Sequence, residues 1–214
     1  MSHYRRPARA ALAATLTACL TAGTAMADEM SHGMEHMATD TQPARPIADS
    51  IARLEADKEG LRMSLETREL TPGHVTTAWW VIMTNPSACS ATPCPADDVI
   101  GRAAEVGTQI AFADGAVNAP DGTASFAAYL PAGAVPHGWY NQDVPDPTKA
   151  EIHLVLNDHG PLIAEITSSM LTSYRGGCSD ASLPPPFPDR AKADGIAGPN
   201  HCALIQDAIF VQPK

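Results

Sequence analysis

The stretch HVTTAWWVIM, residues 74–83, makes the most hydrophobic strand that the sequence predicts. Its valine, isoleucine, threonine and tryptophan residues are β-branched or aromatic types, which favour strands. Turn sequences bound it, TPG at residues 71–73 and NP at residues 85–86. We therefore expect this strand at the centre of a sheet. Because neighbouring side chains on a strand point to opposite faces, one of Trp79 and Trp80 should lie in the core and the other on the far face or under a loop.

Segments on both sides of this strand carry similar signals. Apolar and polar residues alternate with period two over residues 51–56 and 61–66, which predicts a hairpin. Its turn should lie between Asp57 and Gly60. Further strands are predicted over residues 105–112, 123–130, 151–156 and 204–211. About seven short strands separated by turns indicate an all-β fold, mainly an antiparallel β-sandwich.

One short helix is expected among these strands. Over residues 162–174, the apolar side chains of Leu162, Ile166 and Met170 fall on one helical face. The later stretch 183–200 is rich in proline and glycine and predicts a long loop. Residues 47–214 thus predict a single β-sandwich domain with long, disulfide-stapled loops.

The first 27 residues have the composition of an export signal. Residues 1–9 carry three arginines and no acidic residue, and an apolar, small-residue stretch follows over residues 10–22. This stretch is shorter than the roughly 20 apolar residues of a transmembrane helix, so we expect no membrane span. The expected location is periplasmic or secreted.

Two processing sites compete in this segment. The sequence AMA at residues 25–27 fits the small-x-small rule of ordinary signal peptidase, which would remove residues 1–27. The sequence LTAC resembles the bacterial lipobox, in which residues 1–18 are removed and Cys19 is lipidated. The second route would anchor the protein to an envelope membrane by lipid.

The net charge argues against two classes of partner. The whole chain carries a formal charge of −10, and removal of a signal with three arginines would leave −13. Binding to nucleic acid or to anionic lipid depends on lysine and arginine side chains that neutralise phosphates. We expect neither partner, whereas cations are compatible with such a surface.

Both processing routes leave four cysteines, Cys89, Cys94, Cys178 and Cys202. An even number of cysteines in an oxidising compartment predicts two disulfides, and three pairings are open. We favour Cys89 with Cys94 and Cys178 with Cys202, because each pair lies within one loop-like stretch. A four-thiolate zinc site is the rival interpretation, but such sites usually have two-residue spacings, which neither pair shows.

Residues 28–46 are polar, rich in methionine and histidine, and lack apolar periodicity, which predicts a flexible N-terminal arm. Thioethers bind Cu(I) and imidazoles bind both oxidation states of copper, so closely spaced methionine and histidine residues on such an arm can wrap one copper ion. The candidate copper ligands are Met30, His32, Met34, His36 and Met37. The alternative is a disordered polar leader without a ligand.

A second candidate metal site lies on the predicted strand 151–156 and just beyond it. Glu151 and His153 share one face of this strand and could converge with His159, next to Asp158, at the strand's end. A carboxylate and two imidazoles are typical ligands of zinc or iron. The alternative is structural, with His153 a buried, hydrogen-bonded histidine and His159 a turn residue.

Aromatic residues offer a third kind of site. Trp139 and Tyr140 lie in a loop rich in proline and glycine, where they could form a ligand platform together with Trp79 or Trp80. Packing of these tryptophans in the core is the alternative.

Several segments together resemble a group of uncharacterised exported bacterial β-sandwich proteins. They are WW at 79–80 followed by NP and the Cys89 and Cys94 pair, His153 followed by HGP at 159–161, and GGC at 176–178. The resemblance implies a shared fold and no particular activity. A weaker similarity, through GTASF at 122–126 and the HGP motif, is to the chordin-type (CHRD) domain, which also implies a β-sandwich.

Three functions follow from these patterns. The first is an exported, non-enzymatic binding or accessory protein of the bacterial envelope, which binds copper through its N-terminal arm. The second is a metal-dependent enzyme centred on His153 and His159. The third is a structural envelope domain whose partner is an unknown protein.

Overall fold

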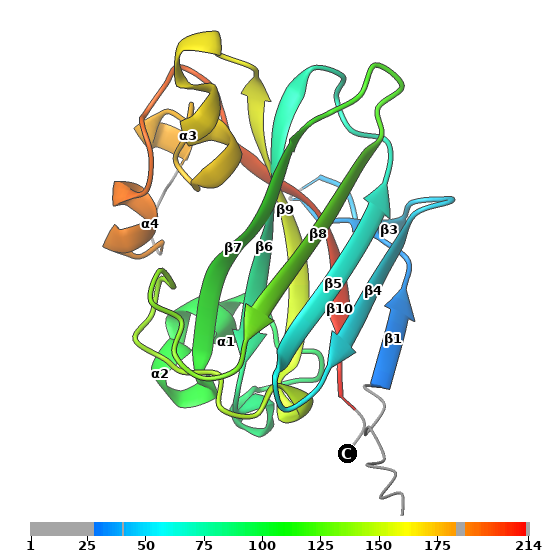
Figure 1. The fold of residues 1–214 in the computed structure, drawn as a ribbon, viewed down its shortest axis with the longest axis vertical. Helices are drawn as coiled ribbons and strands as arrows, with labels where there is room; N and C mark the ends of the chain where they lie inside the picture. The colour runs from blue at the N-terminus through cyan, green and yellow to red at the C-terminus, as the bar shows by residue number, and fades with distance from the viewer. Residues whose placement is uncertain (1–27, 40, 183–186, 213–214) are drawn as a thin grey trace, which may run out of the picture.

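The computed structural model of the protein describes residues 28–39, 41–182 and 187–212 (Figure 1). The predicted signal segment, its two processing sites and Cys19 lie outside the described residues. None of the helices in the described part of the chain is long and apolar enough to cross a bilayer.

Two antiparallel sheets form the body of the protein, as the sequence predicts (Figure 1). The four-stranded sheet has the order β1-β4-β5-β8, with β1 Asp28–His32, β4 Ile51–Ala56, β5 Gly60–Thr67 and β8 Ala124–Pro131. The six-stranded sheet has the order β3-β2-β10-β9-β6-β7, with β3 Arg45–Pro46, β2 Glu35–His36, β10 Ala203–Phe210, β9 Glu151–Pro161, β6 His74–Met83 and β7 Thr108–Val117.

The core lies between the two sheets and is built from alternate residues of their strands. The apolar positions of the predicted hairpin point inward from β4 and β5, with Leu54, Leu61 and Leu65 buried. Trp80 and Leu154 face them from the central strands of the six-stranded sheet. Because side chains alternate along a strand, this inward set leaves an equal set on the outer face of each sheet.

The outer face of the six-stranded sheet carries a second apolar cluster. The strand β6 is buried on both faces along most of its length, and its Trp79 and Val81 belong to this outer cluster. The expected split of the tryptophan pair is confirmed, since Trp80 is in the core and Trp79 lies beneath loops on the other face. Short helices and loops cover the cluster, which therefore behaves as a small second core.

The described part of the chain has more helices than the single one predicted. The segment 162–174 does contain the expected helix, α3, over Thr167–Thr172. Three further short helices are α1 Ala96–Gly101, α2 Ala103–Val106 and α4 Asp189–Ala193. The strand predicted over residues 105–112 is present but starts later than expected, and α4 lies within the long loop predicted over 183–200. In the first case Gly107 ends α2 in the left-handed conformation, with φ of 68°, and the strand starts one residue later.

The N-terminal segment 28–46 is not a flexible arm, which corrects the sequence prediction. Its strand β1 pairs antiparallel with β4, and β2 pairs with both β10 and β3. Met34 is fully buried in the core between the sheets. The alternation of methionine and histidine with polar residues has period two, the pattern of a half-buried strand, and the sheet edges supply the hydrogen bonds that an isolated segment lacks.

Both favoured disulfides are present. Cys89 is joined to Cys94, and Cys178 is joined to Cys202. The first closes a tight loop before α1, and the second ties the segment after α3 to the start of β10. The paired sulfurs leave no thiolate set for the rival four-cysteine zinc site.

Candidate functional site

A row of outward-facing residues crosses the six-stranded sheet and forms the floor of a pocket. The strand register places Asp207 of β10 opposite Val155 of β9, Val155 opposite Trp79 of β6, and Trp79 opposite Phe112 of β7. Adjacent strands lie about 4.8 Å apart, so the backbones of Asp207 and Trp79 are separated by roughly 10 Å. The row therefore joins a carboxyl group at one end to an aromatic group at the other.

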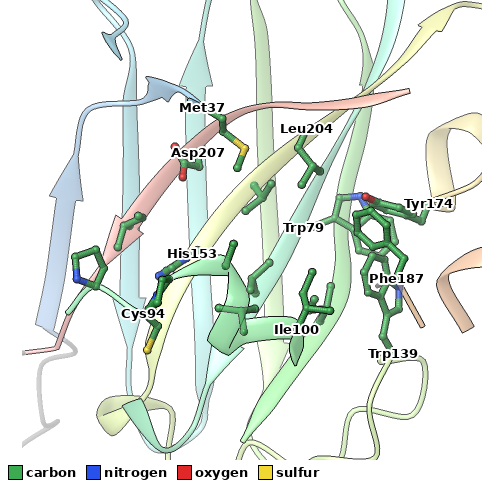
Figure 2. Close-up of a pocket in the computed structure, with 18 residues that line it drawn as sticks. Met37, Trp79, Cys94, Ile100, Trp139, His153, Tyr174, Phe187, Leu204 and Asp207 are labelled. Carbon is green, nitrogen blue, oxygen red and sulfur yellow. The ribbon is translucent and has the colours of Figure 1, made fainter. Parts of the chain in front are cut away.

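Loops and short helices stand around this floor and form an open cavity of about 340 Å³ (Figure 2). Its volume is within the range of small-molecule sites. Figure 2 shows Met37 and Asp207 on one side of the cavity, Trp139, Tyr174 and Phe187 on the other, and Ile100 of α1 between them. Aliphatic side chains supply most of the remaining wall: Val81, Val99, Ile110, Val155, Leu204 and Ile209.

The aromatic wall is assembled from four separate parts of the chain. The ring of Trp79 lies 5.1 Å from that of Tyr174 and 5.4 Å from that of Trp139. The ring of Phe187 lies 5.9 Å from that of Trp139. These are edge-on or tilted contacts at the separations that aromatic pairs favour. Burial raises the pKa of the Tyr174 hydroxyl, which stays protonated.

Trp139 of this wall carries a buried hydrogen-bond donor that has no partner among the described residues. Its side chain is only 7% exposed, and the donor is its indole Nε1. A buried donor without a partner costs free energy, and most such groups in proteins are satisfied.

At the opposite end, a carboxylate holds a histidine in place. The Oε1 atom of Glu151 accepts the backbone N–H of Cys94 at 2.6 Å and the Nε2–H of His153 at 2.8 Å. Both side chains are buried, and His153 lines the cavity. This pairing secures the loop of the Cys89–Cys94 disulfide to β9 and orients the imidazole at the cavity wall.

Asp207 is the unusual group of this site. Its carboxyl group makes no hydrogen bond or ion pair with any described residue. Burial raises the pKa of Asp207 from 3.8 to about 6, the neighbouring Glu35 adds to this, and His153 partly opposes it. Glu35 stands directly across from Asp207 on β2, and like charges in that position repel each other. Among the described residues, the carboxylate therefore has no ion-pair partner, and His153 is the basic group that acts on it from nearby.

The three predicted core ligands do not gather around one metal ion. Glu151 and His153 are in contact, but His159 is six residues further along the extended strand β9, about 20 Å away at 3.3 Å per residue. The prediction of a shared site was wrong, because residues on the same face of a strand move apart along it rather than converging.

His159 instead ties three segments together. Its Nε2 accepts the hydroxyl of Thr77 at 2.7 Å, and its Nδ1–H donates to the carbonyl oxygen of Gly176 at 2.8 Å. Burial lowers the pKa of His159, so the neutral imidazole fits this arrangement. Among the described residues, the one group with metal-like spacing is His159 with Cys178 and Cys202, but these sulfurs form a disulfide. The structural interpretation of this histidine is the one the contacts support.

The predicted copper ligands occupy different surroundings. Met30 and Met34 pack against the core between the sheets, and the ring of His32 meets Phe210 edge-on at 5.0 Å. His36 binds Glu69 at 3.1 Å, whereas Met37 lines the cavity on the outer face. Residues two apart on a strand are roughly 7 Å from each other, so these side chains reach one ion only if β1 and β2 leave their sheets. Copper binding stays a prediction.

Several residues of the cavity were not anticipated from the sequence, namely Asp207, Tyr174 and Phe187. Trp139 was anticipated as part of an aromatic platform, and it does lie against Trp79. A signal for Asp207 exists, because it is the one charged residue in the otherwise strand-like sequence ALIQDAIF of β10. Tyr174 follows Met170 at helical spacing but lies in the loop after α3, and Phe187 reaches the cavity from a loop where no periodicity marks it.

Comparisons of the chain with protein-family models, with curated proteins and with solved structures found no match. Fold and site thus define the class from the molecule alone: a two-sheet antiparallel β-sandwich with an apolar pocket on the outer face of its larger sheet. The resemblances to exported bacterial proteins and to the CHRD domain stay predictions.

Proposed function

We propose that the protein is an exported, non-enzymatic binding protein of the bacterial envelope that holds a small apolar molecule in the pocket lined by Trp79, Val155 and Asp207. The observation that carries this proposal is the cavity of about 340 Å³, whose wall is mostly apolar and aromatic, with His153 as its basic group and Asp207 as its acidic group. Small-molecule sites commonly combine an apolar lining with a few placed polar groups. Two disulfides fit an oxidising compartment outside the cytoplasm.

A neutral fluorescent probe tests the proposal. N-phenylnaphthylamine, which is uncharged at neutral pH and brightens in apolar surroundings, should bind the mature chain with saturation at one site. Trp79 and Trp139 line the cavity, so their emission should change in the same titration.

Filling the cavity should abolish this binding. Ile100 lies on α1 at the cavity wall, and Ile100→Trp adds bulk there. Ile196→Trp is the matched control, because Ile196 is 58% exposed and does not line the cavity. Circular dichroism establishes whether each variant folds. If Ile100→Trp does not fold, Val155→Phe, which fills the cavity from its floor, takes its place. Undiminished probe binding in a folded filling variant, or no binding by the wild-type chain, contradicts the proposal.

The geometry of the site affects each of the other functions predicted from the sequence in a different way. The metal-dependent enzyme loses its geometric basis, because His153 and His159 are far apart on β9. The structural envelope domain is the account that remains if the pocket binds no probe. Copper binding is independent of the pocket and has its own test.

A further inference from the structure

We propose that the pocket binds an arylalkylamine, with the ring against the wall of Trp79, Trp139, Tyr174 and Phe187 and the ammonium group against Asp207. This inference rests on the proposed function and specifies the class of its ligand. Packing alone explains neither the Asp207 end of the pocket nor its aromatic end.

The charge of the cavity favours a cation. Among the described residues, no lysine or arginine lines it, whereas the carboxyl group of Asp207 does. Glu35 stands across from Asp207 on β2, and the one basic group nearby, His153, is already bound to Glu151. An ammonium group of the ligand would give the unpaired carboxylate its partner and relieve the repulsion between Glu35 and Asp207.

An organic cation fits better than a metal ion. Within the described ranges, Asp207, Glu35 and His153 are not part of any set of three ligand atoms with metal-like spacing. Hard metal ions require several oxygen ligands, and transition metals several donors at short range. An ammonium group, by contrast, needs one carboxylate and an apolar surface for the carbons attached to it.

The aromatic end favours a flat ring. Four aromatic side chains line one wall, and their rings contact each other at centroid distances of 4.6 to 5.9 Å. Aromatic faces and edges of this kind stack on another ring and exclude water from it. The roughly 10 Å between the backbones of Asp207 and Trp79 then sets the scale of the ligand, a ring joined to an amine by a short alkyl chain.

Three matched ligands test this inference by calorimetry at about pH 7.5. Phenylbutylamine, phenylbutanol and phenylbutyrate share one ring and one chain and differ in charge; the amine stays protonated because alkylamines have pKa values near 10. Phenylbutylamine should bind about 10- to 100-fold more tightly than the alcohol, the value of a charge-assisted hydrogen bond, and phenylbutyrate should bind most weakly.

Replacement of the carboxylate should remove this preference. In Asp207→Asn the amine should bind no more tightly than the alcohol, whereas Glu66→Gln, which removes an exposed carboxylate from the outer face of the other sheet, should leave the preference intact. In the wild-type chain, the preference should also shrink below pH 6, where Asp207 takes up a proton; protonation of Glu35, His153 or Glu151 acts in the same direction. If Asp207→Asn does not fold, the three ligands compared in the wild-type chain still test the inference, and an amine that binds no more tightly than the alcohol overturns it.

The outcomes separate the two proposals. Equal affinity for amine and alcohol, or a preference that survives in folded Asp207→Asn, overturns the amine inference while binding of N-phenylnaphthylamine still supports the apolar pocket. If the wild-type chain binds neither N-phenylnaphthylamine nor any of the three phenylbutyl ligands, both the apolar pocket and the amine inference are overturned.

Discussion

Asp207→Asn should stabilise the protein at neutral pH, because the native state holds an unpaired carboxylate in a partly buried position. Burial raises the pKa of Asp207 from 3.8 to about 6. The folded state therefore binds the proton more tightly than the unfolded state does, and folding becomes less favourable as the group ionises. The stability that protonated Asp207 provides is complete below about pH 4 and is lost as the pH rises through about 6.

The magnitude follows from the two pKa values. The difference corresponds to at most about 3 kcal/mol of unfolding free energy at pH values above 7. Solvent around the partly exposed side chain screens part of this, so we expect a gain of about 1–2 kcal/mol for the asparagine variant. Asparagine keeps the shape of the side chain and removes its charge. Such a gain at the expense of ligand binding is typical of functional sites.

Urea unfolding of both proteins at about pH 3.5 and pH 7.5 measures this gain. The two curves should nearly coincide at the lower pH, and the variant should have the higher midpoint at the upper pH. Glu66→Gln should change the free energy of unfolding by less than about 0.5 kcal/mol at either pH, as exposed substitutions usually do. A gain for Asp207→Asn that is the same at both pH values, or no gain at pH 7.5, refutes the argument.

Three further predictions concern the rest of the molecule. His159→Ala should lower the free energy of unfolding by about 3 kcal/mol, because buried partners lose their hydrogen bonds; a change below about 0.5 kcal/mol in urea unfolding contradicts this. Replacing Cys178 and Cys202 with serine should cost about 3 kcal/mol, since the bond closes a 24-residue separation, and an unchanged melting temperature would oppose this view. Cu(I) titration against a competing chelator should show binding that is lost when the methionines and histidines of residues 28–37 become leucine and asparagine; equal binding by both proteins, or none by the wild-type chain, contradicts the copper prediction.

The fold class could be predicted because it depends on short-range patterns. Residues 51–56 and 61–66 alternate with period two, and the structure forms that hairpin with the alternating apolar residues inward. The same pattern in the N-terminal segment was interpreted as a metal-binding arm, because methionine and histidine are ligand types as well as strand residues. Whether such a segment joins a sheet depends on an open strand edge, which β4 and β10 provide.

The candidate site was harder to predict from the sequence. The contact between Glu151 and His153 follows from their spacing on one strand, and it is present. The expected convergence with His159 fails, because a strand that continues straight separates its ends. The pocket is lined by side chains from β10, β6 and distant loops. Spacing along the chain does not predict that these side chains lie close together.

The amino-acid sequence by itself determined several elements of this protein: the buried central strand, the hairpin beside it and the helix after residue 162. It favoured the two local cysteine pairs among three open pairings, and the structure has those two pairs. These elements depend on periodicity and on turn residues, which act within a few positions along the chain. Tertiary structure alone decided that Asp207 stands about two strand spacings from Trp79 and that Phe187 closes the aromatic wall. Strand order and the packing of loops set those distances, and both depend on contacts between residues far apart in sequence.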